Sequence, residues 1–243
     1  DVPCTPSALT PGYASHLKRT FEQGGVDIAI LGNYLNLLHP DDDYIRQAVE
    51  RYYAHLRFAS LLGGAMVATE TGAPNREYAY CPECRSEKPL SLFIKRIKPI
   101  VRCAEQFGVI LAIEPVVVHS MWNPAACRKV LDEVGNHNLQ ILFDPVNLVD
   151  ISNVDHCQEL FQEFFELVGT EIAAMHLKDY KHTEDGKGLM TVGVPARMGE
   201  MDYSGIMDYI KREKPYLFAT LEDTTPENAA VCVEAMRKAY AEA

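Results

Sequence analysis

Short apolar runs alternate with longer amphipathic segments along most of the chain. The short runs predict buried strands, and the longer segments repeat apolar residues every three to four positions, which predicts helices with one buried face. The expected strands span residues 26–31, 65–69, 109–113, 139–143, 172–175 and 217–221. The expected helices span residues 11–23, 40–62, 90–107, 124–134 and 155–168. This alternation predicts parallel strands joined by helical crossovers.

The spacing of the expected strand ends favours a barrel over a doubly wound open sheet. Glu114, Asp144 and His176 follow one another at intervals of 30 and 32 residues, and each comes directly after an apolar run. The 46 residues from His176 to Glu222 leave room for a further short strand near residues 190–194. With that strand, we count seven strands, each with a helix.

The chain length of 243 residues suits one α/β barrel, because such barrels have about 250 residues. Thr10 and Pro11 carry the cap and first-turn signals of a helix that precedes the first expected strand. We therefore expect a single domain over residues 1–243, an α/β fold of the (β/α)8 TIM-barrel type that lacks its first strand in this chain.

The composition narrows the choice of partners. A net charge of -11 and the absence of a basic stripe argue against nucleic acid as a partner. No apolar run approaches the roughly 18 residues of a membrane span, so we expect no membrane partner. We expect a cytoplasmic protein, in which seven cysteines scattered along the chain are reduced thiols.

One tight cysteine pair stands apart from the scattered thiols. Cys81-Pro82-Glu83-Cys84 lies in a polar loop, but a closed zinc site needs four ligands and no second pair or nearby histidine accompanies it. Incidental thiols are the simplest interpretation, and a metal or redox role stays open.

Four separate apolar runs end on a residue able to bind a metal ion: Glu114, Asp144, His176 and Glu222. The carboxyl ends of barrel strands converge at one mouth, where active sites lie, so these side chains are expected to share one space. Three buried carboxylates would repel one another strongly, and a divalent cation removes that cost. A single such acid is more often a helix cap or a salt-bridge partner, but four at successive strand ends favour a metal site.

The donor set of three carboxylates and one imidazole suits one divalent cation and leaves positions for substrate or water. We expect Mn²⁺ first, with Co²⁺, Mg²⁺ or Zn²⁺ as alternatives.

Several motifs give the chain a family resemblance. The segments Gly-Val-Ile-Leu-Ala-Ile-Glu114-Pro, Phe-Asp144-Pro-Val-Asn147, His176-Leu-Lys178-Asp179 and Leu-Glu222-Asp resemble the xylose isomerase-like TIM-barrel superfamily of sugar phosphate isomerases and epimerases. The loops at residues 33–41 and 195–203 resemble loops of the same superfamily. The resemblance covers nearly the whole chain from about Pro6. These motifs are fairly specific for the superfamily and poorly specific for the substrate.

The resemblance implies a role in carbohydrate metabolism and a function for each motif residue. Glu114, Asp144, His176 and Glu222 would ligate the metal, and the catalytic pair Glu114 and Glu222 would move a proton on a small carbohydrate. A bound metal would stabilise the enediolate that forms when the carbon-bound proton leaves, and this would make that proton more acidic. Two opposed glutamates would permit epimerisation. Many ketose epimerases of the superfamily carry histidine where this chain has Asn147, which puts a simple ketose 3-epimerase assignment in doubt.

Further polar and aromatic side chains are expected to contact the substrate. They are Asn147, Lys178, Arg197, Glu70, His119 and Trp122, and for each of them a structural role is the alternative.

Two other functions stay open at this point, and a third is disfavoured. A metal-dependent dehydratase of an inosose-like polyol would use the same metal and base, and it would need an acid such as His119 or Lys178 beside the leaving hydroxyl. A non-catalytic sugar-binding barrel is the alternative outside enzymes. A nuclease on this fold is disfavoured by the acidic charge and the eight histidines, which are too sparse for several metals. A homo-oligomer is compatible with each of these functions.

Overall fold

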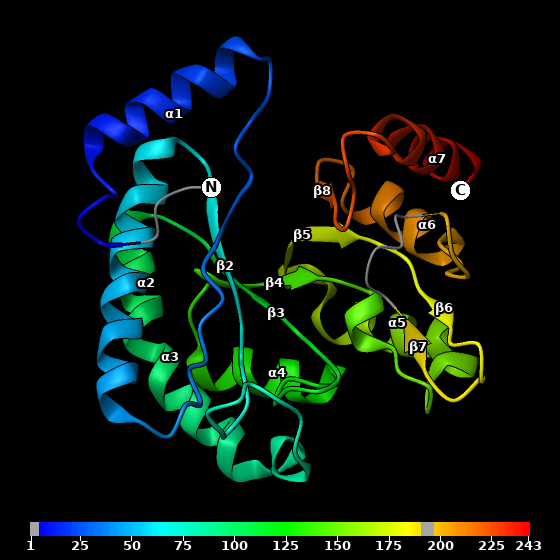
Figure 1. Ribbon diagram of the computed structural model, residues 1–243, viewed down its shortest axis with the longest axis horizontal. Helices are drawn as coiled ribbons and strands as arrows, with labels where there is room; N and C mark the ends of the chain where they lie inside the picture. Colours follow the sequence, from blue (N-terminus) through cyan, green and yellow to red (C-terminus); the bar gives the residue numbers. More distant parts are fainter. Residues whose placement is uncertain (1–4, 191–196) are drawn as a thin grey trace. The chain divides into compact units, whose positions relative to one another are not determined.

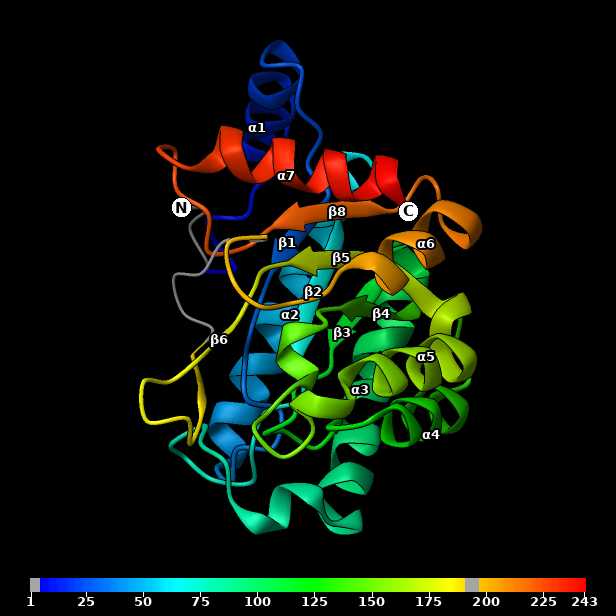
Figure 2. The ribbon, with the colours of Figure 1, turned by 90° about the vertical axis from the view of Figure 1, so that its right-hand side faces the viewer.

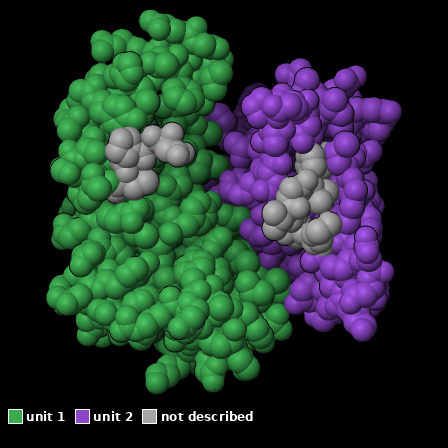
Figure 3. Space-filling model, in the orientation of Figure 1, with its two compact units in different colours: residues 1–122, 126–140 green, residues 123–125, 141–243 purple. Residues whose placement is uncertain are grey.

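The structure of the chain is a computed structural model that describes residues 5–190 and 197–243. The chain is divided into two compact units, coloured green and purple in Figure 3. The first unit comprises residues 1–122 and 126–140, and the second comprises residues 123–125 and 141–243.

Three parallel strands form the sheet of the first unit, in the order β1-β2-β3. They are β1 (Ile30–Gly32), β2 (Met66–Glu70) and β3 (Leu111–Glu114). All four residues of β3 and the first four of β2 are buried, as expected for a parallel sheet that is covered on both faces. Strand β1 begins at Ile30, later than the pattern predicts, and Val26 is more than half exposed.

Local capping explains where the helices of the first unit begin. They are α1 (Pro11–Gln23), α2 (Asp42–Leu62), α3 (Glu87–Phe107) and α4 (Pro124–Val134), with a short 3-10 turn η1 (Pro82–Arg85) before α3. The hydroxyl of Thr10 accepts a hydrogen bond from the backbone amide of Tyr13, as predicted for the start of α1. The carboxylate of Asp41 does the same for the first turn of α2.

The helices bury one face each. Helices α2 and α3 contact each other and run side by side in Figure 1. On α3 the buried residues recur at Phe93, Ile97, Ile100 and Ala104, the spacing that the sequence predicts for one apolar face. Over the residues that the structure describes, no helix has the length and apolarity required to cross a bilayer.

The second unit contains three parallel strands in the order β4-β5-β8. They are the end of β4 (Leu139–Phe143), β5 (Ile172–Leu177) and β8 (Phe218–Leu221). The helices of this unit are α5 (Cys157–Val168), α6 (Ser204–Glu213) and α7 (Ala229–Glu242), with 3-10 turns η2 (Val146–Leu148), η3 (Val154–His156) and η4 (Gly169–Glu171). Figures 1 and 2 show α7 beside β8 and β8 beside β5.

The strand pattern agrees with the expected fold. All six apolar runs that predict strands form parallel strands, and between residue 5 and α1 there is none, as expected for a barrel that lacks its first strand. A further strand was expected near residues 190–194, and residues 191–196 lie outside the described part. Just before them, β7 (Leu189–Met190) pairs antiparallel with β6 (Lys181–His182).

An aromatic cluster fixes the end of β4. Phe143 is fully buried, and its ring centroid lies 6.1 Å from that of Phe161 and 4.7 Å from that of Phe164, both on α5. Because Phe143 is the last residue of β4, this packing sets the position of the next residue, Asp144.

We expect Phe143→Ala to lower the free energy of unfolding by about 3–5 kcal/mol, because it opens a cavity in this cluster. Urea denaturation measures the loss. Phe218→Ala is the control, since 44% of Phe218 is exposed and its truncation should cost much less. Equal losses in the two variants would contradict the role of the cluster.

Candidate metal centre

The carboxylate of Asp144 is held at the end of β4 by the turn that follows it. Asp144 is fully buried, and its Oδ1 accepts hydrogen bonds from the backbone amides of Val146 and Asn147 at 2.9 and 3.1 Å. These amides belong to η2, so the chain direction after β4 fixes one carboxylate oxygen. Its Oδ2 faces the side chains described next.

His176 and Glu222 come from the neighbouring strands β5 and β8. The Nδ1 of His176 lies 3.9 Å from Oδ2 of Asp144 and 3.6 Å from Oε1 of Glu222. The backbone amide of Glu222 donates to the carbonyl of Leu177 at 3.0 Å, which extends the β5–β8 pairing to the end of β8. One ligand atom from each of Asp144, His176 and Glu222 lies within 4.8 Å of the others. A cluster of two carboxylates and one imidazole could bind a divalent metal ion.

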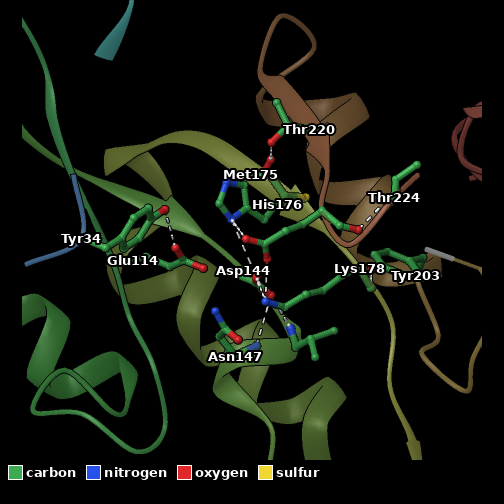
Figure 4. A network of polar contacts seen from close by, with 12 residues as sticks. Tyr34, Glu114, Asp144, Asn147, Met175, His176, Lys178, Tyr203, Thr220 and Thr224 are labelled. Carbon is green, nitrogen blue, oxygen red and sulfur yellow. Dashed lines mark hydrogen bonds and ion pairs between the residues drawn. The ribbon is translucent and has the colours of Figure 1, made fainter. Parts of the chain in front are cut away.

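The amine of Lys178 lies against both carboxylates. Its Nζ is 2.9 Å from Oδ2 of Asp144 and 2.6 Å from Oε2 of Glu222. Figure 4 shows the Lys178 side chain reaching toward Asp144, with His176 close to the same carboxylate. Burial by itself lowers the pKa of Lys178, but the negative charges of Asp144 and Glu222 outweigh burial and raise that pKa. The amine therefore stays charged and compensates the buried carboxylate.

A second buried carboxylate, Asp179, organises the chain just after β5. It is fully buried, its Oδ1 accepts from the backbone amides of Tyr180 and Met201, and its Oδ2 accepts from that of Gly199, all at 2.8–2.9 Å. A side chain at Gly199 would collide with Asp179, because an added Cβ would lie 2.5 Å from Oδ1. The sequence offered Asp179 only as part of a family motif, and its anchoring role was not predicted.

The first unit carries two glutamates at neighbouring strand ends. Glu70 and Glu114 are in register across β2 and β3, and Glu114 is almost fully buried. Each receives a hydrogen bond from a tyrosine hydroxyl: Tyr78 donates to Glu70 at 2.7 Å, and Tyr34 donates to Glu114 at 2.9 Å. Figure 4 shows the Tyr34 hydroxyl pointing at Glu114. Burial, and then the charge of Glu70, raise the pKa of Tyr78, which keeps its hydroxyl protonated as a donor. Neither tyrosine was among the predicted site residues.

His119 lies next to Glu70 in the first unit. Its Nδ1 is 3.4 Å from Oε2 of Glu70, and its ring meets that of Tyr78 edge-on at 5.0 Å between centroids. Burial lowers the pKa of His119 to about 4, although the charge of Glu114 opposes that shift. The imidazole is therefore neutral near neutral pH, and it can donate from one nitrogen and accept at the other.

The remaining predicted substrate contacts, Trp122, Arg197 and Asn147, differ in exposure and in the groups that they lie against. Trp122 is partly exposed, and the guanidinium of Arg85 lies 4.9 Å from its ring centroid. Arg197 is exposed, with a left-handed backbone φ of 65°. Asn147 lies in η2, beside the carboxylate to which its backbone amide donates.

The structure thus groups the predicted residues within each unit. The second unit brings together Asp144, Asn147, His176, Lys178 and Glu222. The first unit brings Glu70 together with His119 and sets it in register with Glu114. Trp122, which lies against Arg85, and the exposed Arg197 belong to neither group.

Comparison with known sequences identifies the family. A profile described as xylose isomerase-like TIM barrel matches residues 3–239, nearly the whole chain. The chain belongs to the xylose isomerase-like TIM-barrel family. In barrels of this type the carboxyl ends of the strands carry the active site, which is where Glu114, Asp144, His176 and Glu222 lie along their own strands. A search of curated proteins found no match.

Several solved structures share the fold of this chain at low sequence identity. A D-tagatose 3-epimerase-like protein matches with a TM-score of 0.74 and 17% identity, over 96% of this chain and 84% of that one. A probable 3-DHS dehydratase from Bacillus anthracis matches with a TM-score of 0.68 and 16% identity, over 91% and 81%. A 3-keto-D-glucoside 4-epimerase from E. coli matches with a TM-score of 0.64 and 12% identity, over 94% and 84%. At these identities, the likeness establishes the fold alone.

We expect Lys178→Met to lower the free energy of unfolding by about 3–5 kcal/mol in metal-free buffer, because it leaves the buried charge of Asp144 without its ammonium partner. Urea denaturation in the presence of a chelator measures this. Lys129→Met is the matched control, because Lys129 forms an exposed ion pair with Glu133 that is worth little. A Lys178→Met variant as stable as the control would contradict this account of the buried charge.

The low pKa of His119 gives stability a defined pH dependence. Between pH 6.5 and about 4 the unfolded chain binds a proton at His119 that the folded chain does not, so stability falls as the pH is lowered through this range. The full loss is on the order of 3 kcal/mol. Urea denaturation of the parent protein and of His119→Asn across that range should show the steeper loss in the parent. An NMR titration of the His119 ring with a midpoint near 6.5 would contradict it.

Proposed function

We propose that the chain is a divalent-metal-dependent isomerase or epimerase that moves a proton on a sugar or sugar derivative. The observation that carries the proposal is the cluster of Asp144, His176 and Glu222, whose ligand atoms lie within 4.8 Å of one another at the carboxyl ends of parallel strands. Membership of a family of sugar isomerase-like barrels supports it.

The proposed metal ligands are Asp144, His176, Glu222 and, as the fourth, Glu114 at the end of β3. Carboxylates and an imidazole suit Mn²⁺, which we favour, as well as Co²⁺, Mg²⁺ and Zn²⁺. When bound, the cation would polarise a substrate carbonyl and stabilise the negative charge that develops on its oxygen.

The proposed proton carriers are Glu114 and Glu222. The hydrogen bond from Tyr34 orients the Glu114 carboxylate, and the contact with Lys178 orients that of Glu222. For epimerisation, one carboxylate would remove the carbon-bound proton and the other would deliver a proton to the opposite face of that carbon. For isomerisation, a single carboxylate would remove the proton and return it to the neighbouring carbon on the same face.

The remaining residues are proposed to bind the substrate. A neutral His119 beside Glu70 offers hydrogen bonds to hydroxyl groups without adding a charge. Trp122 suits the apolar face of a sugar ring, as aromatic side chains do in carbohydrate pockets. Asn147 and Arg197 are proposed as further polar contacts, the first from η2 and the second from the exposed end of its loop.

The test measures metal content first. We expect about one divalent ion per chain after incubation with Mn²⁺ and removal of the excess, and a loss of at least about tenfold in affinity for Asp144→Asn and Glu114→Gln. Glu166→Gln, on the exposed face of α5, is the matched control and should bind as the parent does. Failure of the folded parent protein to bind any divalent ion would refute the metal-dependent function.

Turnover is then followed as solvent deuterium uptake. A panel of ketoses and their derivatives is incubated in D₂O with the Mn²⁺-loaded protein, and deuterium at the carbon next to the carbonyl is read by mass spectrometry. We expect uptake in at least one sugar and a drop of at least about a hundredfold in Glu222→Gln, the size of a lost general base. Metal binding without uptake in any sugar would favour a sugar-binding barrel.

A dehydratase of an inosose-like polyol is the second candidate, and the position of Lys178 favours it. A charged amine 2.6 Å from Oε2 of Glu222 puts a strong hydrogen-bond donor for a leaving hydroxyl beside a base. One solved structure of similar fold is described as a probable dehydratase. Formation of a conjugated carbonyl product, followed by ultraviolet absorbance, would distinguish this reaction from proton transfer alone.

A further inference from the structure

The pair Cys81 and Cys84 forms a compact dithiol in the first unit. Their sulfur atoms are 3.6 Å apart at the start of η1. Cys84 is fully buried and Cys81 is partly exposed, so one sulfur is open to a reagent in solution and the other lies behind it. The proposed function uses neither residue.

Hydrogen bonds of the loop hold the two thiols in this arrangement. The backbone amide of Cys84 donates to the carbonyl of Cys81 at 2.9 Å, which closes the turn between them. The side-chain amide of Asn75 donates to the sulfur of Cys81 at 3.6 Å and to the carbonyl of Ala79 at 2.8 Å, and its Oδ1 accepts from the amide of Ala79. The two sulfurs therefore lie close together in a turn that is stabilised by its own backbone hydrogen bond and by the side chain of Asn75.

A structural zinc site does not fit these two residues. Such a site needs four ligands. Within the described residues, the one cluster of three or more potential metal ligands contains neither Cys81 nor Cys84. Two neighbouring thiols without further ligands are suited to thiol–disulfide chemistry instead.

We propose that Cys81 and Cys84 are a reversible dithiol–disulfide pair that reacts with low-molecular-weight disulfides. The thiolate of Cys81 attacks one sulfur of glutathione disulfide, forms a mixed disulfide and releases one glutathione thiolate. The thiolate of Cys84 then attacks the sulfur of Cys81 and displaces the second glutathione. The two cysteines lose two electrons and two protons, and one glutathione disulfide becomes two glutathiones, so the exchange is balanced.

The different exposure of the two sulfurs assigns their order. Cys81 is the attacking residue, because a reagent reaches the partly exposed sulfur first. Cys84 is the resolving residue, because it lies 3.6 Å behind Cys81 and its attack is intramolecular. Burial raises the pKa of the Cys84 thiol, which agrees with a residue that stays protonated until the mixed disulfide has formed.

A tryptophan that can report on this loop by its fluorescence lies against it. Arg85 follows Cys84 directly, its guanidinium lies 4.9 Å from the ring centroid of Trp122, and it donates to the carbonyl of Val117 at 3.2 Å. Trp122 is the only tryptophan of the chain. Closure of the disulfide is therefore expected to change tryptophan fluorescence, independently of any catalytic activity.

The experiment titrates the folded protein with glutathione redox buffers and maps disulfides by peptide mass spectrometry. In a Cys103→Ser background, which removes another partly exposed thiol, we expect a Cys81–Cys84 disulfide that lowers the mass by two hydrogen atoms and returns to the dithiol with excess glutathione. Fluorescence should follow the same titration. Cys84→Ser should accumulate the mixed disulfide on Cys81, and Cys81→Ser should react at least about tenfold more slowly than the background protein.

Three results would overturn the proposal. The first is a folded protein that forms no Cys81–Cys84 disulfide under fully oxidising glutathione. The second is a Cys81→Ser variant that reacts as fast as the Cys103→Ser protein. The third is bound zinc that survives in Asp144→Asn and is lost in both cysteine variants, because the thiolates would then be metal ligands.

Discussion

The constraint on which the site depends is the compensation of negative charge at the ends of buried strands. Asp144 has no solvent exposure, and an isolated carboxylate in such a place would cost several kcal/mol. The turn after β4 supplies two backbone amides to one of its oxygens, and Lys178 supplies a full positive charge to the other. The aromatic packing of Phe143 holds the end of β4 in place. The position of the Asp144 charge therefore depends on the packing of the core beside it.

The two units stabilise their buried carboxylates with different contacts. In the second unit one ammonium group is shared between the carboxylates of Asp144 and Glu222, so one positive charge faces two negative ones. In the first unit the glutamates receive hydrogen bonds from tyrosine hydroxyls, and the neighbouring imidazole of His119 is neutral. The arrangement in the second unit relies on the attraction between opposite charges. The contacts described for the two glutamates of the first unit are hydrogen bonds from neutral hydroxyl groups.

The sequence predicted the strands well because each apolar run is short, buried and followed directly by a polar residue. Glu114 and Asp144 could be placed at strand ends for that reason. The partners of the acids at the strand ends could not be predicted, because they come from remote positions: Tyr34 lies 80 residues before Glu114, and Lys178 lies 44 residues before Glu222. Local pattern carries no information on such pairs. The strand expected near residues 190–194 stays a prediction, because residues 191–196 lie outside the described part of the chain.

The anchoring of two chain segments by Asp179 affects how much change in length this chain tolerates between them. The same carboxylate receives the amide of Tyr180 on one side and the amides of Gly199 and Met201 on the other. The segment between these points therefore begins and ends at fixed places, whatever its length. Because the entropy of closing a loop grows only slowly with its length, insertions and deletions there would cost little stability. The length of the segment between Tyr180 and Gly199 could therefore change in evolution without moving the strand ends that carry His176 and Glu222.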